Sequence, residues 1–145
     1  MGEHMNIGIM GAGNIGGTMA GTIAKIQDVT CYGIASRELQ KAEQFAAKFG
    51  VTRAYGSYEE MLADPMIELG YVATPHSQHY ENMMLCIEYG KPVLCEKAFT
   101  VNAKQAREVL DFAKEKNVFV TEAMWTRYMP MRNTITEVLA SKIIG

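Results

Sequence analysis

The sequence lacks the features of two large protein classes. No apolar run approaches the ~20 residues that a membrane-spanning helix needs, so we expect no membrane partner. Basic residues are not in excess, because 14 Lys and Arg stand against 16 Asp and Glu and leave a formal net charge of -2. A nucleic-acid-binding protein usually carries a basic surplus. The sequence therefore predicts neither a membrane nor a nucleic-acid partner.

Cysteines and secretion signals are also scarce. The three cysteines, Cys31, Cys86 and Cys95, are odd in number and lack the spacing of a metal site. We therefore expect no metal centre and interpret them as reduced, buried thiols of a cytoplasmic protein. The first residues show no apolar stretch leading to a small-residue cleavage site. We interpret residues 1–5 as an expression leader, with Met5 a plausible native start.

What remains is the composition of one globular domain. The 145 residues are 48% hydrophobic and 21% charged, enough for a substantial core. Short apolar runs predict β-strands at residues 6–10, 29–35, 52–55, 69–73, 93–95 and 118–121. Helical spacing of apolar residues predicts helices at 14–26, 38–49, 77–89, 102–116 and 131–142, with a shorter one between a Ser57 cap and Asp64.

The order of these elements predicts the fold class. Strands that alternate with helices imply parallel pairing through right-handed crossovers. The strands are continuous apolar runs, which is typical of a sheet covered by helices on both faces. We predict an α/β fold: a Rossmann doubly wound parallel sheet in three layers, α/β/α, with strand order 3-2-1-4-5-6. The domain should span residues 6–123, and residues 124–145 should form a crossover segment and a helix.

A glycine-rich loop follows the first predicted strand and opens the first predicted helix. The run Gly11-Ala12-Gly13-Asn14-Ile15-Gly16 fits G-x-G-x-x-G in the context that a dinucleotide site requires. Gly11 permits the tight turn, Gly13 lets the backbone approach a pyrophosphate, and Gly16 allows close packing of helix on strand. The phosphates would bind the free N–H groups at the helix start, those of Asn14 and Ile15 among them. The alternative is a glycine-rich turn without a ligand.

The end of the second predicted strand indicates which dinucleotide binds. An NAD site usually has an acidic residue about 20 residues after the loop, on the ribose hydroxyls. This chain has Ser36-Arg37 there. A carboxylate would repel a 2′-phosphate, whereas an Arg fork and a Ser hydroxyl attract one. We therefore predict NADP as the cofactor, with NAD less favoured; the alternative is that Arg37 is merely a solvated residue at a strand end.

A Glu96-Lys97 pair ends the fifth predicted strand, at the edge where open α/β sheets bind ligands. In isolation such a pair is most often a surface ion pair. Here it is one of four ordered motifs: the glycine loop, the Thr74-Pro75 turn followed by His79, Gly-Lys-Pro-Val before Glu-Lys, and the segment Trp125–Pro130. With these motifs the chain resembles, from Asn6 to its last residue, the Gfo/Idh/MocA family (glucose–fructose oxidoreductase, inositol dehydrogenase and rhizopine catabolism).

Two details refine the resemblance. The stretch Glu122–Tyr128 is most similar to the dihydrodiol dehydrogenase branch, which uses NADP, in agreement with Ser36-Arg37. The family usually reads Glu-Lys-Pro, whereas this chain has Ala98 after Lys97. That difference removes one rigid bend and leaves both reactive side chains in place.

The resemblance implies roles for individual residues. Lys97 would be the catalytic lysine that polarises or protonates a carbonyl oxygen during hydride transfer. Glu96 would orient Lys97 or lie near the nicotinamide ribose. Further cofactor contacts are implied for Thr74, Pro75, His79, Trp125 and Arg127. His76 and His79 stand one helical turn apart, but no third ligand is apparent, so capping or packing is the preferred interpretation.

The resulting hypothesis is the NADP(H)-binding domain of an oxidoreductase acting on a sugar, polyol or dihydrodiol, a small carbohydrate-like substrate. In the family a second, α+β domain supplies the substrate contacts, so we expect this chain to bind cofactor and to be inactive alone. A dinucleotide-sensing module without catalysis is the alternative. A methyltransferase is disfavoured, because its site normally has an acidic residue at the position where this chain has Ser36-Arg37. The apolar segment Met124–Met131 should be exposed and should favour a homodimer.

Overall fold

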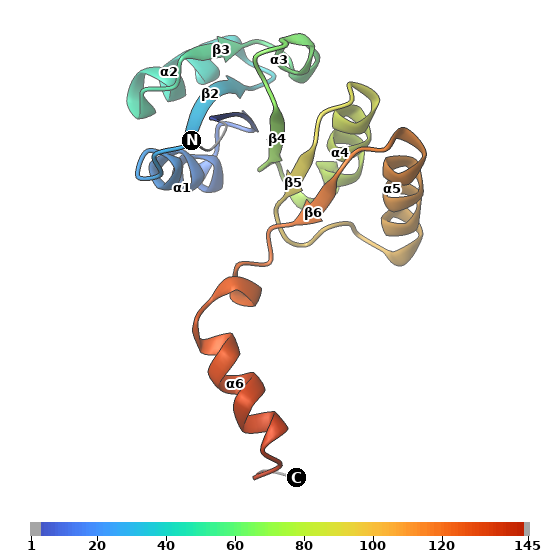
Figure 1. Cartoon of the computed structure of the whole chain (residues 1–145). Helices are drawn as coiled ribbons and strands as arrows, with labels where there is room; N and C mark the ends of the chain where they lie inside the picture. Colours follow the sequence, from blue (N-terminus) through green and yellow to red (C-terminus); the bar gives the residue numbers. More distant parts are fainter. Residues whose placement is uncertain (1–3, 144–145) are drawn as a thin grey trace.

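A computed structural model describes residues 4–143 and shows a single six-stranded parallel sheet in the order β3-β2-β1-β4-β5-β6 (Figure 1). The predicted fold class and strand order are thereby confirmed. The strands are β1 (Met5–Met10), β2 (Val29–Ala35), β3 (Arg53–Tyr55), β4 (Leu69–Val72), β5 (Val93–Cys95) and β6 (Val120–Glu122). The helices are α1 (Asn14–Ile23), α2 (Leu39–Phe49), α3 (Tyr58–Ala63), α4 (His79–Glu88), α5 (Ala103–Lys116) and α6 (Met131–Ala140), with 3-10 turns η1 (His76–Gln78) and η2 (Trp125–Tyr128).

Alternation along the strands divides the core into two layers. Successive side chains of a strand point to opposite faces of the sheet, and the neighbours Ile9 and Met10, both fully buried, belong to different core clusters. Ile9 packs in the cluster that contains the buried residues of α1 and α2. Met10 packs in the cluster that contains those of α3, α4 and α5. The three-layer α/β/α arrangement follows from this division.

Capping residues fix two of the predicted helix ends. The Ser57 hydroxyl accepts a 3.1 Å hydrogen bond from the Glu60 N–H and caps α3, as a serine at that position does in general. Gly50 ends α2 in the left-handed conformation, at φ +68°, which glycine adopts without a Cβ penalty. These two predicted boundaries are confirmed.

The sixth strand is shifted from its predicted position. It covers Val120–Glu122 rather than 118–121. Asn117 ends α5 in the left-handed conformation, and the Val118 N–H donates to the Ala113 carbonyl, so Val118 belongs to the helix cap. Smaller corrections apply elsewhere: α1 ends at Ile23 instead of residue 26, β4 at Val72 instead of 73, and α6 at Ala140 instead of 142. Residues 76–78, partly assigned to α4 from the sequence, form the separate turn η1.

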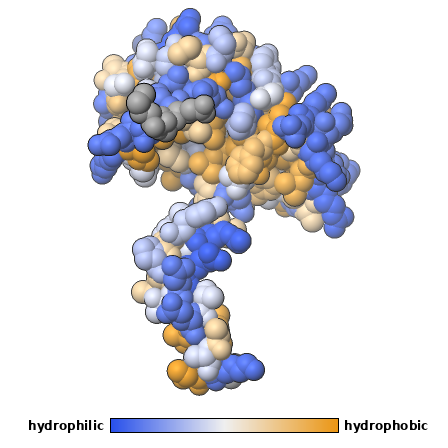
Figure 2. All heavy atoms as spheres, in the orientation of Figure 1, coloured by the Kyte–Doolittle hydropathy of each residue, from blue (hydrophilic) through white to orange (hydrophobic). Residues whose placement is uncertain are grey.

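The start of the described chain is part of the sheet, whereas its C-terminal segment lies outside the sheet domain. Residues 1–3 of the expected leader lie outside the described residues, whereas Met5 is paired in β1 opposite Val29. At the other end, η2 and α6 extend away from the sheet domain (Figure 1). We call residues 124–143 the C-terminal extension; all of them are exposed. Figure 2 shows hydrophobic as well as hydrophilic atoms along this extension. Within the described part of the chain, no helix is long and apolar enough to cross a membrane.

Candidate cofactor and catalytic site

The glycine loop has the shape of a phosphate cradle. Gly11 has φ +108°, and a Cβ there would lie 2.9 Å from the Ala73 carbonyl oxygen. A Cβ on Gly16 would lie 2.5 Å from the Gly11 carbonyl oxygen, whereas a Cβ on Gly13 would meet nothing within 4 Å. Two glycines are therefore demanded by the fold itself. Gly13 is not, and its open side lets a ligand approach the backbone, as a pyrophosphate does in loops of this kind.

The start of α1 presents unpaired N–H groups beside this open side. The first helical hydrogen bond runs from the Gly17 N–H to the Gly13 carbonyl oxygen, at 3.0 Å. The N–H groups of Asn14, Ile15 and Gly16 precede it and have no acceptor in the helix. The first turn carries no acidic residue that would repel an anion. The residues present thus fit a dinucleotide pyrophosphate.

Ser36 and Arg37 directly follow β2, whose last residue, Ala35, accepts a 3.0 Å hydrogen bond from the Gly11 N–H of the glycine loop. The Ser36 N–H donates to the Tyr55 carbonyl oxygen at 3.2 Å, and its hydroxyl accepts from the Glu38 N–H at 3.4 Å. Arg37 is exposed. Burial raises the pKa of Tyr58, and the Arg37 guanidinium acts against this rise, which places it close to the phenol of α3. An exposed guanidinium at this strand end is available to an anionic ligand.

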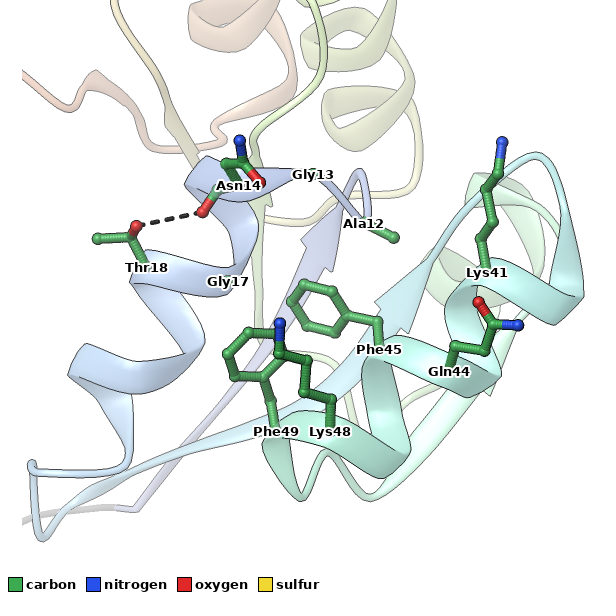
Figure 3. A pocket seen from close by; sticks show the side chains of 10 residues that line it. All are labelled: Ala12, Gly13, Asn14, Gly17, Thr18, Lys41, Gln44, Phe45, Lys48 and Phe49. Carbon is green, nitrogen blue, oxygen red and sulfur yellow. Dashed lines mark hydrogen bonds between the residues drawn. The ribbon is translucent and has the colours of Figure 1, made fainter.

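A groove between α1 and α2 continues from the glycine loop. It has a volume of about 600 Å³, and its lining includes Gly13, Thr18, Lys41, Lys48 and Phe49. Figure 3 shows the Phe45 and Phe49 rings side by side between the helices, with their centroids 4.6 Å apart. The Lys41 Nζ lies 2.6 Å from the Glu38 carboxylate, and both side chains are largely exposed. The groove adds two lysines to the positive charge that Arg37 provides.

A second, smaller hollow lies at the carboxyl ends of β4 and β5. Its volume is about 60 Å³. It is lined by Ile15, Ala73, Thr74, His76, His79, Glu96 and Lys97. Five of the residues singled out in the sequence as site residues therefore meet here, although they are spread over 83 positions of the chain from Ile15 to Lys97. The parallel sheet brings them together, because the carboxyl ends of neighbouring strands share one edge.

The Glu96 carboxylate is held by a hydrogen bond from a buried tyrosine. The Tyr71 hydroxyl donates to the Glu96 carboxylate at 2.5 Å, and the second carboxylate oxygen accepts from the Lys97 backbone N–H at 3.2 Å. Burial raises the pKa of Tyr71, and the hydrogen bond to Glu96 raises it further. Among residues 4–143, no ion pair joins the Glu96 carboxylate to the Lys97 ammonium. Glu96 thus contacts the backbone of Lys97 and leaves its exposed side chain free to meet a ligand.

The Thr74-Pro75 turn is held by α4. His79 is fully buried, and its Nε2 lies 2.9 Å from the Thr74 carbonyl oxygen. Its Nδ1 lies 2.8 Å from the Ala98 carbonyl oxygen, next to the Lys97–Ala98 peptide bond, which is cis. The Asn82 side-chain amide donates to the Thr74 hydroxyl at 2.9 Å. One face of α4 therefore fixes both the end of β4 and the segment after β5.

The fold and this geometry can be compared with known proteins. A family profile described as "Oxidoreductase family, NAD-binding Rossmann fold" matches residues 5–124. The chain belongs to the Gfo/Idh/MocA oxidoreductase family. Trans-1,2-dihydrobenzene-1,2-diol dehydrogenase of Mus musculus is 46% identical over 112 residues, which are 77% of this chain and 34% of that protein. D-xylose 1-dehydrogenase (NADP(+)) of Hypocrea jecorina is 48% identical over 114 residues, 77% of this chain and 29% of that protein.

A solved structure gives the same result. The NAD binding oxidoreductase from Klebsiella pneumoniae superposes with a TM-score of 0.88 at 29% identity, over 98% of this chain and 40% of that chain. The resemblance inferred from the four motifs is thereby confirmed. This Gfo/Idh/MocA chain spans about a third of the length of the curated relatives it matches.

Trp125 and Arg127 lie apart from both the hollow and the glycine loop. Trp125 and Arg127 belong to η2, at the start of the C-terminal extension, and both are exposed. The Trp125 side chain is 63% exposed. Neither residue lines the hollow at Lys97 or the groove at the glycine loop. A cofactor contact of these two residues stays a prediction.

Sequence reasoning did not single out four residues that the structure places at the site. Tyr71 and Asn82 hold Glu96 and Thr74, and Lys41 and Lys48 line the groove. A signal for the lysines was present: Lys41 and Lys48 are one heptad apart within the predicted helix, a spacing that puts helical residues on one face. Tyr71 gave no signal, because a tyrosine within an apolar strand is most simply read as core.

Proposed function

We propose that this chain is the NADP(H)-binding domain of an oxidoreductase that transfers hydride between the nicotinamide and a carbonyl or alcohol of a sugar, polyol or dihydrodiol. The observation that carries the proposal is the position of Lys97 and Glu96 in one hollow with Ile15 and Thr74, beside a glycine loop that is open only at Gly13. Such a reaction requires a cofactor site and a reactive lysine at the same edge of the sheet, where the carboxyl ends of the strands meet.

The glycine loop and α1 would hold the pyrophosphate. Ser36 and Arg37 would hold the 2′-phosphate of NADP, because a hydroxyl and a guanidinium both donate hydrogen bonds to phosphate oxygens. Lys41 stands close by and would add positive charge, although Glu38 partly neutralises it at 2.6 Å. Support for NADP also comes from the relative named D-xylose 1-dehydrogenase (NADP(+)).

The chemistry at Lys97 follows from its charge and freedom. A bound nicotinamide supplies or accepts the hydride. In carbonyl reduction the Lys97 ammonium would donate a hydrogen bond to the oxygen and then a proton to the alkoxide that forms; in alcohol oxidation the neutral amine would accept that proton. Glu96, anchored by the Tyr71 hydroxyl, would present its carboxylate to a hydroxyl of the ribose or of the substrate.

The proposed substrate class rests on the relatives rather than on the residues of the site. The named relatives act, by their names, on a trans-dihydrodiol of benzene and on D-xylose. Both molecules carry adjacent hydroxyl groups on a ring or chain, and we propose a substrate of the same chemistry for the protein that contains this domain. We propose further that the chain alone binds cofactor without turning over substrate, and that it works in the cytoplasm.

Calorimetric titration of the chain with NADPH and with NADH tests the proposal. We expect saturable binding of NADPH at a stoichiometry of one, and weaker binding of NADH. The control is the Gly13→Ala variant, whose added methyl group has room in the fold but occupies the open side of the loop. Absence of binding to either nucleotide would contradict the proposed function, whereas preference for NADH would contradict only the assignment of Ser36 and Arg37.

A further inference from the structure

Within the part of the chain that the structure describes, the His79 ring meets two hydrogen-bond acceptors and no donor. Its ring is 0% exposed. Nδ1 lies 2.8 Å from the Ala98 carbonyl oxygen, and Nε2 lies 2.9 Å from the Thr74 carbonyl oxygen. Carbonyl oxygens only accept hydrogen bonds. Both contacts can be hydrogen bonds only if both ring nitrogens donate.

A neutral imidazole cannot satisfy this geometry. It has one N–H and one lone pair, so either tautomer would direct a lone pair at a carbonyl oxygen inside a buried site. The imidazolium donates from both nitrogens, and hydrogen bonds from a charged donor are about twice as strong as neutral ones. Burial of the charge has a desolvation cost, and the two charge-assisted bonds act against it. We propose that His79 is held as a doubly protonated imidazolium and is a positioning residue for the Lys97–Ala98 segment.

Other charged and titratable groups face the same ring. On η1, His76 lies edge-on to His79 with the ring centroids 5.3 Å apart. From the end of β5, Glu96 and Lys97 line the hollow that His79 also lines. Asn82, one turn further along α4, is neutral and is already engaged with the Thr74 hydroxyl.

The consequence is a link between two parts of the candidate site. Thr74 follows β4, and Ala98 follows β5 directly after Lys97; the His79 side chain joins them. Loss of either ring N–H would remove one of the two hydrogen bonds. The Lys97–Ala98 segment or the Thr74 turn would then be held by one fewer contact. The consequence for catalysis rests on the proposed function, whereas the protonation state does not.

NMR of the 15N-labelled chain tests the protonation state directly. The chain has three histidines, so the ring signals can be assigned with single His4→Asn and His76→Asn variants. In long-range 1H–15N spectra near neutral pH, we expect both His79 ring nitrogens to show the shifts of protonated nitrogens. The exposed His4 and His76 rings provide an internal comparison in the same spectra. A His79 ring with one protonated nitrogen at neutral pH would overturn the proposal.

Variants test the positioning role. His79→Gln keeps one amide donor on a flexible side chain, and His79→Leu keeps the volume and removes both donors. We expect faster amide hydrogen exchange at Phe99 and Lys97 in His79→Leu and partial rescue in His79→Gln. In the protein that contains the complete active site, His79→Gln should lower kcat by about 5–10-fold, the effect of one lost hydrogen bond, with the KM for NADPH unchanged.

The two proposals fail in distinguishable ways. If the chain bound no dinucleotide but both His79 nitrogens were protonated, the proposed function would be wrong and the inference on His79 would stand. If NADPH bound and His79 were neutral, the reverse would hold. Unchanged exchange at Lys97 and Phe99 in a folded His79→Leu variant would refute the positioning role. Should that variant fail to fold, the spectrum of the unaltered chain still decides the protonation state.

Discussion

Gly16 stands so close to Gly11 that a Cβ on Gly16 would lie 2.5 Å from the Gly11 carbonyl oxygen. A contact this short with backbone cannot be relieved by a side-chain movement, so the start of α1 and the end of β1 are locked together. Gly13 lies between the two, and a Cβ there would meet nothing within 4 Å. The loop therefore contains glycines of two kinds, one required by packing and one left open.

This difference predicts opposite outcomes for two alanine variants. Gly16→Ala should lower the free energy of unfolding by about 1–3 kcal/mol, the usual cost of overpacking, and should also weaken NADPH binding because the loop must move. Gly13→Ala should leave the free energy of unfolding nearly unchanged and still weaken NADPH binding. Urea denaturation and calorimetry measure the two quantities. Equal loss of stability in both variants would contradict the distinction.

Cofactor selectivity should depend on charge at the end of β2. Arg37→Ala should weaken NADPH binding by about 1–3 kcal/mol, as expected for a charged hydrogen bond, and should change NADH binding little. Glu38→Gln should act in the opposite direction, because it removes the carboxylate that lies 2.6 Å from the Lys41 Nζ and frees that lysine for the phosphate. Calorimetric titration with both nucleotides measures the ratio of affinities.

Salt dependence provides the control for this prediction. An interaction with the 2′-phosphate is screened by salt, so the NADPH affinity of the unaltered chain should fall with ionic strength more steeply than that of Arg37→Ala. Lys104→Ala, which removes an exposed lysine of α5, should leave both affinities unchanged. If Arg37→Ala weakened NADPH and NADH equally, Arg37 would not read the 2′-phosphate.

Lys97 should govern the rate and not cofactor binding. In the protein that contains the complete active site, Lys97→Ala should lower kcat by about 10²–10⁴-fold, the usual effect of losing a general acid or an electrostatic donor. NADPH affinity should be nearly unchanged, because Lys97 lies beyond the glycine loop at the end of β5. Steady-state kinetics and calorimetry measure both. A Lys97→Ala enzyme with near-normal kcat would exclude the lysine from the mechanism.

The strand order could be predicted from the sequence because it follows from the succession of all strands and helices along the chain. Alternating strands and helices leave few topologies once right-handed crossovers are required, and the glycine loop marks the first strand. Boundaries depend on single caps and were less accurate. Asn117 adopts the left-handed conformation without being glycine, and this cap shifted β6 by two residues from its predicted start. The predicted helix ended correctly at residue 116, but the local sequence does not show that Val118 closes the cap instead of beginning the strand.

The candidate site was predictable where it is carried by motifs. Lys97, Glu96 and the glycine loop were identified from ordered patterns, and the structure brings Lys97 and Glu96 into one hollow with Ile15. The supporting contacts were not predictable. The hydrogen bond from Tyr71 to Glu96 joins residues 25 positions apart, and it depends on the register of β4 against β5. Register is a property of the folded sheet rather than of either strand alone.

The three thiols should be unreactive in the folded chain. Burial raises the pKa of Cys31 to about 11 and those of Cys86 and Cys95 to about 12. The thiolate is the reactive form, and at pH 8 little of it is present at such values. We expect negligible reaction with Ellman's reagent in native buffer and three reactive thiols in denaturant. Rapid reaction of even one native thiol would show that it is accessible.

The same shifts predict a loss of stability at alkaline pH. An unfolded cysteine ionises near pH 8.5, whereas the folded thiols ionise at about 11 to 12. The folded state thus binds these protons more tightly than the unfolded state. The contribution of the protonated thiols to the free energy of unfolding is therefore complete below the unfolded pKa and decreases as the pH rises above it. Urea midpoints should decline from about pH 9 upward. In a Cys31→Ala variant the decline should be shallower.

The C-terminal extension should make the chain self-associate. Met131, Ile135, Val138 and Leu139 lie at helical spacing along α6 and are between 41% and 59% exposed, an apolar stripe of the kind that favours association. A second copy of the chain offers the same stripe, and two such helices bury it by packing together. Light scattering over a concentration range should show a monomer–dimer equilibrium, and the fluorescence of Trp125, the only tryptophan, should shift to shorter wavelength as the dimer forms. Ile135→Lys should abolish the dimer, whereas its neighbour Thr136→Lys, off the stripe, should retain it. A strict monomer at every concentration, or equal effects of the two lysines, would show that α6 is not the contact.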